Sequence, residues 1–216
     1  DQHVQLLANH AMTELFEENG HVTGALFKTP AGWVKINAKH AVILATGGFP
    51  HDETRKQALF QHVADGTPHH SAAPETNTGD GLKAAEAIGA VVDQHLPWAG
   101  AWAPVSLMPR LDGTLGRFPH LVERGKPGLI AVLRNGRRFT NEGDSYPAFI
   151  KDLFKSTNKG GQAHCWLICD HQFIRRYGLG AVKPFPISMQ SWLDNGYLKS
   201  GKTLHELAMA CGIDAL

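Results

Sequence analysis

The segment at residues 40–49, HAVILATGGF, places the strongest constraint on how this chain can fold. Residues 40–45 form a short, continuous apolar run, which is typical of a strand buried on both faces of a parallel sheet. Gly47 and Gly48 follow at once and let the main chain approach a flat or phosphorylated group, although a tight turn would use the same residues. The segment therefore favours an α/β fold, and both a binding site and a plain turn stay open at the end of this strand.

Short strands surround this segment in the first part of the chain. Asn19-Gly20 is a strong turn signal, and residues 50–77 read mostly as a polar loop. A helix is predicted at residues 78–88, because Thr78 can cap its start and Gly89 suits the left-handed position at its end. The other elements expected here are strands at residues 4–7, 11–17, 22–28, 32–37 and 40–45, and a helix at residues 52–59.

The pattern changes near residue 95, where we place a domain boundary that divides the chain into residues 1–95 and 96–216. Residues 97–119 are rich in Pro, Gly and Trp and show little periodicity. The elements expected in the second part are strands at residues 129–133, 137–140 and 165–169, and helices at residues 146–154, 170–177 and 203–211, the last with a capping box. The mixture predicts an α/β (α+β) chain.

Composition excludes several classes of function. The formal net charge of +1 offers no basic surface for nucleic acid or an anionic membrane. No apolar run approaches the roughly 20 residues that a membrane-spanning helix needs. Cys165, Cys169 and Cys211 are too sparse for a disulfide framework or a metal site, so we expect buried thiols, no metal and a cytoplasmic protein. With Asp at residue 1 and no visible signal peptide, we interpret the chain as a piece of a longer protein.

Three motifs in a fixed order carry a family resemblance: ATGGF at residues 45–49, NTGDGL at residues 77–82, and PGLIAVLRNGRRFTNEGDSY at residues 127–146. The amides and helix dipole of NTGDGL would attract partial negative charge, such as that of a reduced flavin. Over essentially the whole chain, the motifs resemble the fumarate reductase/succinate dehydrogenase flavoprotein family, including its 3-ketosteroid dehydrogenase branch.

The resemblance implies FAD as cofactor and a particular domain organisation. Residues 1–95 would be the second half of a Rossmann-like FAD-binding domain, and residues 96–216 an inserted α+β capping domain. The GxGxxG phosphate loop would lie upstream of this chain. The residues implied to contact the cofactor are Met12 beside the adenine, Ala45, Thr46, Gly47 and Gly48 along the cofactor, and Asn77, Thr78, Gly79 and Asp80 near the flavin ring. Plain packing or turn formation is the alternative for each of them.

Departures from the dicarboxylate members of the family point to a different substrate. Those members have a His-Pro-Thr segment after the TGDG helix, a Thr-Glu pair before the arginine that Arg124 matches, and a catalytic Arg where this chain has Tyr146. A dicarboxylate needs cationic clamps and a placed proton donor. The residues offered instead are Pro97, Trp98, Trp102, Pro104 and Tyr146, which suit a flat, apolar, keto-bearing substrate.

Tyr146 is the expected catalytic residue, and Trp98, Trp102 and Arg124 are the expected substrate-binding residues. By resemblance to ketosteroid dehydrogenases, the tyrosine would help remove a proton from the carbon beside the ketone while a hydride leaves for flavin N5. A phenol with an ordinary pKa near ~10 acts as a base only if its phenolate is stabilised or it works in a pair. Core packing is the alternative for both tryptophans.

Three other functions stay open on the sequence alone. One is a dicarboxylate oxidoreductase of the same family, and another is a catalytically silent remnant of the fold. The third is a phosphate-binding module at residues 196–203, GYLKSGKT, which matches G-x-x-x-x-G-K-[ST]. That motif works only when a hydrophobic strand leads into it, and the preceding residues are polar and not strand-like.

Overall fold

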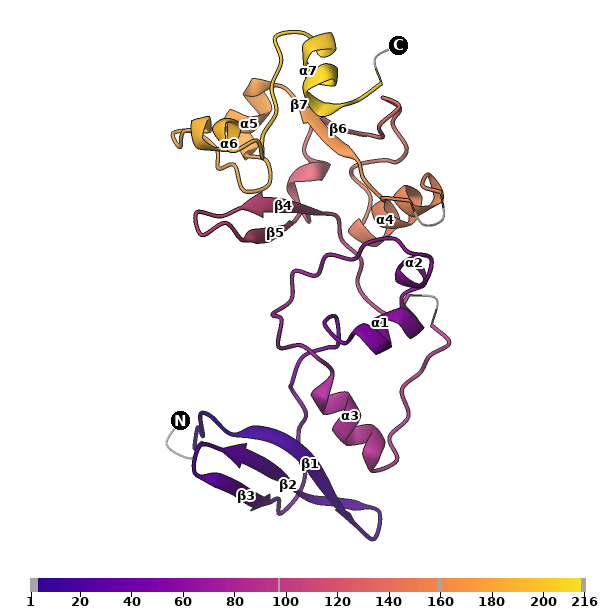
Figure 1. Ribbon diagram of the computed structural model, residues 1–216, viewed down its shortest axis with the longest axis vertical. Helices are drawn as coiled ribbons and strands as arrows, with labels where there is room; N and C mark the ends of the chain where they lie inside the picture. Colours follow the sequence, from indigo (N-terminus) through magenta and orange to yellow (C-terminus); the bar gives the residue numbers. More distant parts are fainter. Residues whose placement is uncertain (1–3, 97, 159–160, 215–216) are drawn as a thin grey trace. The chain divides into compact units, whose positions relative to one another are not determined.

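The computed structural model describes residues 4–96, 98–158 and 161–214, so Pro97 lies outside the described residues. Helices and strands are mixed, and the chain forms two compact units (Figure 1). The first comprises Asp1–Leu59 and Ala73–Pro97, and the second comprises Phe60–Ala72 and Trp98–Leu216. Residues 60–72 thus return to the second unit, whereas the sequence placed them in the first domain. The identity of the units as flavin and capping domains stays a prediction.

The first unit is built on a three-stranded antiparallel sheet in the order β1-β2-β3. The strands are β1 (Ala11–Glu18), β2 (His21–Thr29) and β3 (Gly32–Asn37). The predicted turn at Asn19-Gly20 joins β1 to β2, and both residues adopt positive φ angles of 54° and 78°. Helix α3 (Asp80–Ala87) packs on this sheet, where Ala84 joins Leu15 and Ala25 in a small core.

Two predicted strands of the first unit do not form. Residues 4–7 and 40–45 lack strand structure, and Leu6 and Ile43 are 90% and 88% exposed. A strand is held by hydrogen bonds to a neighbour, and no segment among the described residues pairs with either run. The apolar run before Gly47 therefore lacks regular secondary structure and is mostly exposed, although Val42 packs against the small core.

Both helices of the first unit begin later than the sequence predicts. Helix α1 (Glu53–Leu59) begins after Asp52, whose Oδ1 accepts a hydrogen bond from the Arg55 amide at 3.0 Å. Helix α3 begins at Asp80 and not at Thr78, because Gly79 takes a left-handed conformation with φ 76° at the N-cap position. Thr78 therefore does not cap the helix, and its hydroxyl donates to the Asp80 carboxylate at 2.9 Å.

The second unit holds two separate antiparallel strand pairs. Strands β4 (Val105–Pro109) and β5 (Leu115–Pro119) pair with each other, as do β6 (Leu129–Val132) and β7 (Trp166–Cys169). Leu129, Phe173, Ile174 and Val182 form the buried core beside the second pair. The helices are α2 (Gln61–Ala64), the 3-10 helix η1 (Glu123–Gly125), α4 (Tyr146–Lys155), α5 (His171–Tyr177), α6 (Gln190–Asp194) and α7 (Leu204–Cys211).

The second unit confirms the three predicted helices and two of the three predicted strands, which are β6 and β7. Helices α4, α5 and α7 lie within a residue or so of their predicted bounds, and Thr203 Oγ1 caps α7 by accepting from the Glu206 amide at 3.1 Å. The predicted strand at residues 137–140 is wrong, since only an isolated bridge joins Val132 to Arg138 and β6 pairs with β7 instead. The β4–β5 hairpin was not predicted, because Pro and Gly interrupt its alternation.

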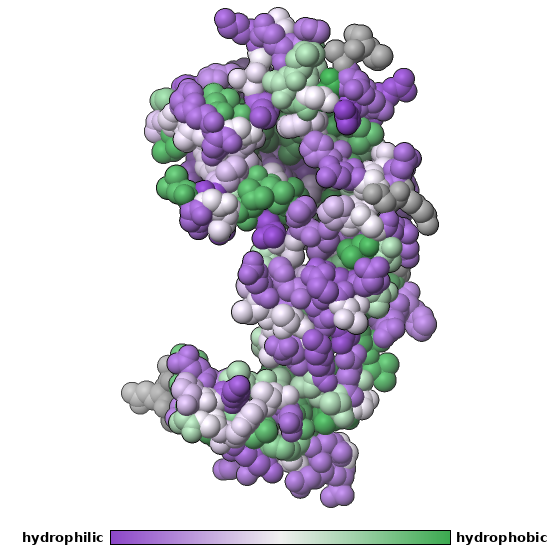
Figure 2. All heavy atoms as spheres, in the orientation of Figure 1, coloured by the Kyte–Doolittle hydropathy of each residue, from purple (hydrophilic) through white to green (hydrophobic). Residues whose placement is uncertain are grey.

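Hydrophobic side chains reach the surface at several places among predominantly hydrophilic ones (Figure 2). The exposed fractions of the side chains identify Val91, Leu111 and Leu204 as largely exposed hydrophobic residues. Across the described ranges, no helix is both long enough and apolar enough to span a bilayer.

Candidate functional site

The predicted cofactor residues of the first unit converge on one another. The Gly79 amide donates to the Gly48 carbonyl at 3.2 Å. Gly47 has φ 78°, and a Cβ added to it would lie 2.8 Å from Asn77 Oδ1. A Cβ added to Gly81 would overlap the Thr46 hydroxyl. The two glycine-rich motifs, ATGGF and NTGDGL, are therefore closely packed: Gly47 and Gly81 leave room for the side chains of Asn77 and Thr46, and one main-chain hydrogen bond joins the motifs.

This glycine-lined surface fits a flat, electron-rich group. Residues 45–48 are exposed, and they lie beside the first turn of helix α3, whose free amides carry partial positive charge. A ring could approach the bare main chain at Ala45 to Gly48 without meeting a large side chain. These are the properties that the flavin ring of FAD requires, so the residues present fit the predicted cofactor.

A cluster of charged residues ties helix α1 to helix α3 behind this surface. Arg55 donates two hydrogen bonds to Glu86, at 3.1 and 2.6 Å, and Lys83 Nζ lies 2.9 Å from Asp52 Oδ2. The hydrogen bond from the Arg55 amide, followed by that from Lys83, lowers the pKa of Asp52. The sequence analysis missed this cluster, because spacing within each helix does not reveal that the two helices meet.

Met12, the residue expected beside the adenine, is partly buried on strand β1. It packs against the small core of Leu15, Ala25 and Ala84. The structure thus gives it a packing role, and its contact with the adenine stays a prediction.

Tyr146, the expected catalytic residue, is the first residue of helix α4 and is 36% exposed. The Ser145 hydroxyl caps the helix, and Pro147 occupies its first turn, where a missing amide hydrogen costs nothing. The loop before it is anchored by Glu142, which is 5% exposed. The helix start therefore presents the Tyr146 ring at the surface of the second unit on a fixed base.

Arg124, the expected substrate-binding cation, is almost completely buried, with 3% of its surface exposed. Its Nε donates to the His120 carbonyl at 3.1 Å, and its Nη1 donates to the Glu142 carbonyl at 2.6 Å. The guanidinium also lies over the Phe149 ring at 5.3 Å, and burial lowers its pKa. In this structure Arg124 joins η1 to the loop before Tyr146, and a direct contact with substrate stays a prediction.

The two tryptophans expected at the substrate have different surroundings. Trp102 is buried and meets Phe60 and His62 edge-on, with ring centroids 4.6 and 4.9 Å apart. Trp98 is 41% exposed, and its ring centroid lies 6.4 Å from that of Trp102. Trp102 is therefore a core residue of an aromatic cluster, and Trp98 is the member of the pair with an accessible face.

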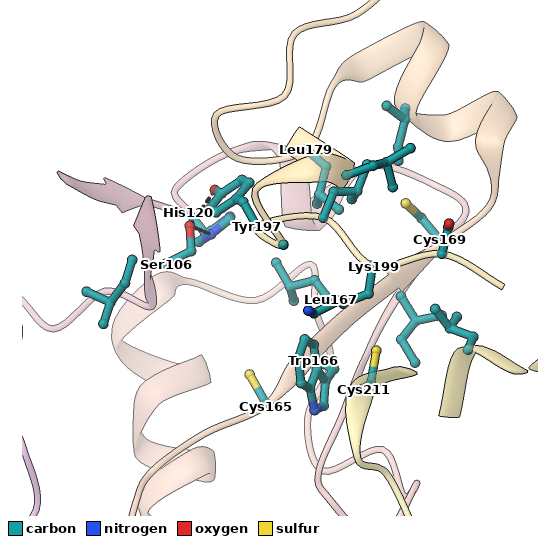
Figure 3. Close-up of a pocket in the computed structure, with 18 of the residues that line it drawn as sticks. Ser106, His120, Cys165, Trp166, Leu167, Cys169, Leu179, Tyr197, Lys199 and Cys211 are labelled. Atoms are coloured by element: carbon teal, nitrogen blue, oxygen red, sulfur yellow. Dashed lines mark hydrogen bonds between the residues drawn. The ribbon is translucent and has the colours of Figure 1, made fainter. Parts of the chain in front are cut away.

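A cavity of about 1040 Å³ lies within the second unit, and the sequence analysis did not anticipate it. Figure 3 shows Ser106, His120 and Tyr197 together at one end, with Leu167 and Leu179 among the apolar residues of the lining. Ser106 and Tyr197 are 91 residues apart, so no local signal in the sequence could have joined them.

All three cysteines line this cavity as free, partly buried thiols. Burial raises the pKa of Cys165 to about 12 and that of Cys169, helped by the neighbouring Asp170, to about 11. Such thiols are poor nucleophiles and poor metal ligands at neutral pH. Within the described part of the chain, no group of three or more potential metal-binding side chains comes together.

The GYLKSGKT segment does not have the surroundings of a phosphate loop. It follows helix α6, whereas a phosphate loop follows a strand. Helix α7 does follow it, but the capping box closes locally, since the Glu206 carboxylate accepts from the Lys202 amide at 2.7 Å. The segment is a connection between two helices.

Comparisons with known proteins place these features in context. A family model described as FAD binding domain matches residues 1–213. The 4-oxocyclohex-2-ene-1-carboxylate 5-dehydrogenase of Sinomonas cyclohexanicum is 37% identical over 200 residues, covering 92% of this chain and 33% of that protein. A 3-oxosteroid 1-dehydrogenase of Mycolicibacterium smegmatis is 33% identical over 223 residues, covering 98% and 37%.

A solved structure supports the same relationship. The chain is similar to 3-ketosteroid delta1-dehydrogenase from Sterolibacterium denitrificans, solved in complex with 1,4-androstadiene-3,17-dione, with a TM-score of 0.70 and 29% identity. The match covers 95% of this chain and 36% of that chain. The chain thus spans about a third of the length of the curated relatives it matches.

Proposed function

Because this chain belongs to the FAD binding domain family, we propose that it is part of an FAD-dependent dehydrogenase that oxidises a CH–CH bond beside a ketone. The observation that carries this proposal is the exposed glycine surface formed by residues 45–48 against residues 77–81. The names of the relatives describe dehydrogenation of 3-oxosteroids and of an oxocyclohexene carboxylate. We therefore infer a largely apolar, cyclic ketone as the substrate class, in preference to a dicarboxylate.

In this proposal the first unit holds the cofactor, as the second half of a Rossmann-like FAD-binding domain. Ala45 to Gly48 would line the flavin ring, Asn77 to Asp80 would approach its electron-rich edge, and Met12 would pass the adenine. FAD, when bound, supplies a two-electron acceptor for a hydride. The amides at the start of helix α3 would stabilise partial negative charge on the ring.

The second unit would supply the substrate-facing residues, as an α+β capping domain. Tyr146 Oη would take the proton from the carbon beside the ketone, which requires its phenolate to be stabilised or paired. Trp98 would offer an apolar face to the substrate ring, and Trp102 would support it. Arg124, held by the carbonyls of His120 and Glu142, would position the loop before Tyr146.

The partner in this proposal is a small molecule. A cytoplasmic location stays a prediction that rests on sparse, unpaired cysteines.

The test is the reduction of bound flavin by a 3-ketosteroid without oxygen, in protein expressed from its complete gene. Tyr146→Phe removes only the hydroxyl, and we expect flavin and substrate binding to persist while reduction slows about 10²–10⁴-fold. Tyr177→Phe, at a partly buried core position, is the matched control and should reduce at the wild-type rate. Reduction of Tyr146→Phe at the wild-type rate would remove the tyrosine from the mechanism.

A further inference from the structure

A continuous chain of hydrogen bonds crosses the polar end of the cavity in the second unit (Figure 3). His120 Nδ1 lies 2.5 Å from Glu123 Oε1, and His120 Nε2 lies 2.9 Å from Ser106 Oγ. Ser106 Oγ is also 2.6 Å from the Tyr197 hydroxyl, which accepts a hydrogen bond from the Ala181 amide at 3.1 Å. Ser106 thus contacts both His120 and Tyr197, and each of these has a further fixed partner, Glu123 or the Ala181 amide.

The fixed donors and acceptors at the two ends set the direction of the chain. The Ala181 amide can only donate, so the Tyr197 oxygen accepts there and its own hydrogen points to Ser106. The Glu123 carboxylate can only accept, so His120 Nδ1 carries a hydrogen, and Nε2 is an acceptor in the neutral form of the ring. In that form Ser106 donates its hydroxyl hydrogen to His120 Nε2, which is the arrangement of a serine with its general base.

The local structure holds this arrangement in place. His120 is 6% exposed and follows strand β5, and Ser106 lies on strand β4, which pairs with β5. Burial opposes ionisation of Glu123, but hydrogen bonds, led by that from His120, lower its pKa. Gly180 has φ 58°, and a Cβ there would overlap the Tyr197 hydroxyl and lie 3.0 Å from His120 Cε1.

The cavity offers this serine a substrate-sized, mostly apolar space. Ser106 lines it and is partly exposed, and Leu167, Leu179 and Leu193 are among its other lining residues. The serine hydroxyl has one donor and two acceptor positions, of which the donor is used toward His120 and one acceptor toward Tyr197. A lone pair remains to attack an electrophile.

We propose that Ser106 is a nucleophile activated by His120 and Glu123, and that the cavity accepts an ester with an apolar acyl group. Ser106 Oγ forms a bond to the ester carbonyl carbon while His120 Nε2 takes its proton. The bond from that carbon to the alcohol oxygen breaks, and the leaving alkoxide receives the proton from His120. Water, deprotonated by the same nitrogen, then releases the acid and restores Ser106. This acyl transfer is independent of the proposed flavin chemistry.

The test is covalent labelling by an alkyl fluorophosphonate, followed by intact mass and peptide mapping, in protein expressed from its complete gene and shown to be folded by circular dichroism. We expect one label, on Ser106. His120→Gln should slow labelling by about 10²-fold or more, and Glu123→Gln should slow it less. Ser191→Ala changes an exposed serine on helix α6, and labelling should be unaffected.

A second measurement uses only the wild-type protein, so it holds even if a variant fails to fold. Hydrolysis of 4-nitrophenyl butyrate by the wild-type protein should show a burst equal to the protein concentration, and prior labelling of Ser106 should abolish it. No label on Ser106 in the folded wild-type protein would overturn the proposal. Equal labelling rates in folded wild-type and His120→Gln protein would overturn it as well.

Discussion

Arg138 donates two parallel hydrogen bonds to Glu142, from Nε to Oε1 at 3.0 Å and from Nη2 to Oε2 at 2.6 Å. Glu142 Oε1 also accepts from the Ala131 amide in strand β6 at 2.7 Å. The pair thus ties β6 to the loop that leads into helix α4 and Tyr146. The RRFTNE sequence, which contributes to the family resemblance, acts in this structure as the anchor for that loop.

Glu142→Ala should destabilise the protein by roughly 1–3 kcal/mol, because it leaves the buried Ala131 amide without its acceptor. Urea denaturation, followed by circular dichroism, measures this difference. Asp144→Ala, two residues away on the exposed part of the same loop, is the control and should change stability little. An unfolding midpoint of Glu142→Ala equal to that of the wild type would contradict the anchoring role.

The same carboxylate predicts a dependence of stability on pH. Burial opposes ionisation of Glu142, but hydrogen bonds from Arg138 and the Ala131 amide lower its pKa in the folded state. A carboxyl whose folded pKa is lowered stabilises the fold above its unfolded pKa of ~4.3, and this stabilisation is lost as the pH falls through the lower folded value. The stability difference between wild type and Glu142→Gln should therefore shrink below about pH 4.3. A difference that stays constant or grows there would refute this assignment.

Gly47→Ala should weaken FAD binding, because its Cβ would push the Asn77 side chain away from the flavin surface. Gly20 has the same φ of 78°, but a Cβ added to it would meet no heavy atom within 4 Å. Gly20→Ala therefore carries only the strain of a left-handed conformation, roughly 1–2 kcal/mol. Flavin fluorescence titration of both variants, expressed from the complete gene, separates contact from strain. Equal FAD affinities for the two variants would argue against the proposed cofactor surface.

Cys165 should react very slowly with Ellman's reagent at pH 8. A rise of its pKa from 9.0 to about 12 lowers the thiolate fraction about 10³-fold, and the thiolate is the reacting species. Peptide mapping after timed labelling assigns a rate to each cysteine. The chain in about 8 M urea, which solvates apolar groups, supplies the unfolded reference. Rapid native labelling of Cys165 would show that the thiol is not buried.

Local chemistry explains which elements could be predicted from the sequence. The turn at Asn19-Gly20 and the cap at Thr203 each depend on residues close in the chain, and both form as expected. The strand at residues 40–45 does not, because a strand depends on a partner that its own sequence cannot supply. Ser106 and His120 escaped notice for a related reason, since their hydrogen bond arises from the pairing of β4 with β5.

The candidate site residues also divide into those that the local sequence could predict and those that it could not. The glycines of ATGGF follow an apolar run and those of NTGDGL lie at the start of a helix, so both could be recognised from the sequence. The structure brings the two motifs together. The buried partners of Arg124 were not recognisable, because both are main-chain carbonyls, at His120 and Glu142, that any sequence would provide.

The most direct test of the flavin account is the visible absorption spectrum of the protein expressed from its complete gene, before and after anaerobic addition of a 3-ketosteroid. The account predicts a flavin spectrum that bleaches when the ketone is added. Bleaching by succinate and not by the ketone would overturn the substrate class while leaving the family intact. A protein that shows no flavin spectrum, even after FAD is supplied, would contradict the central claim.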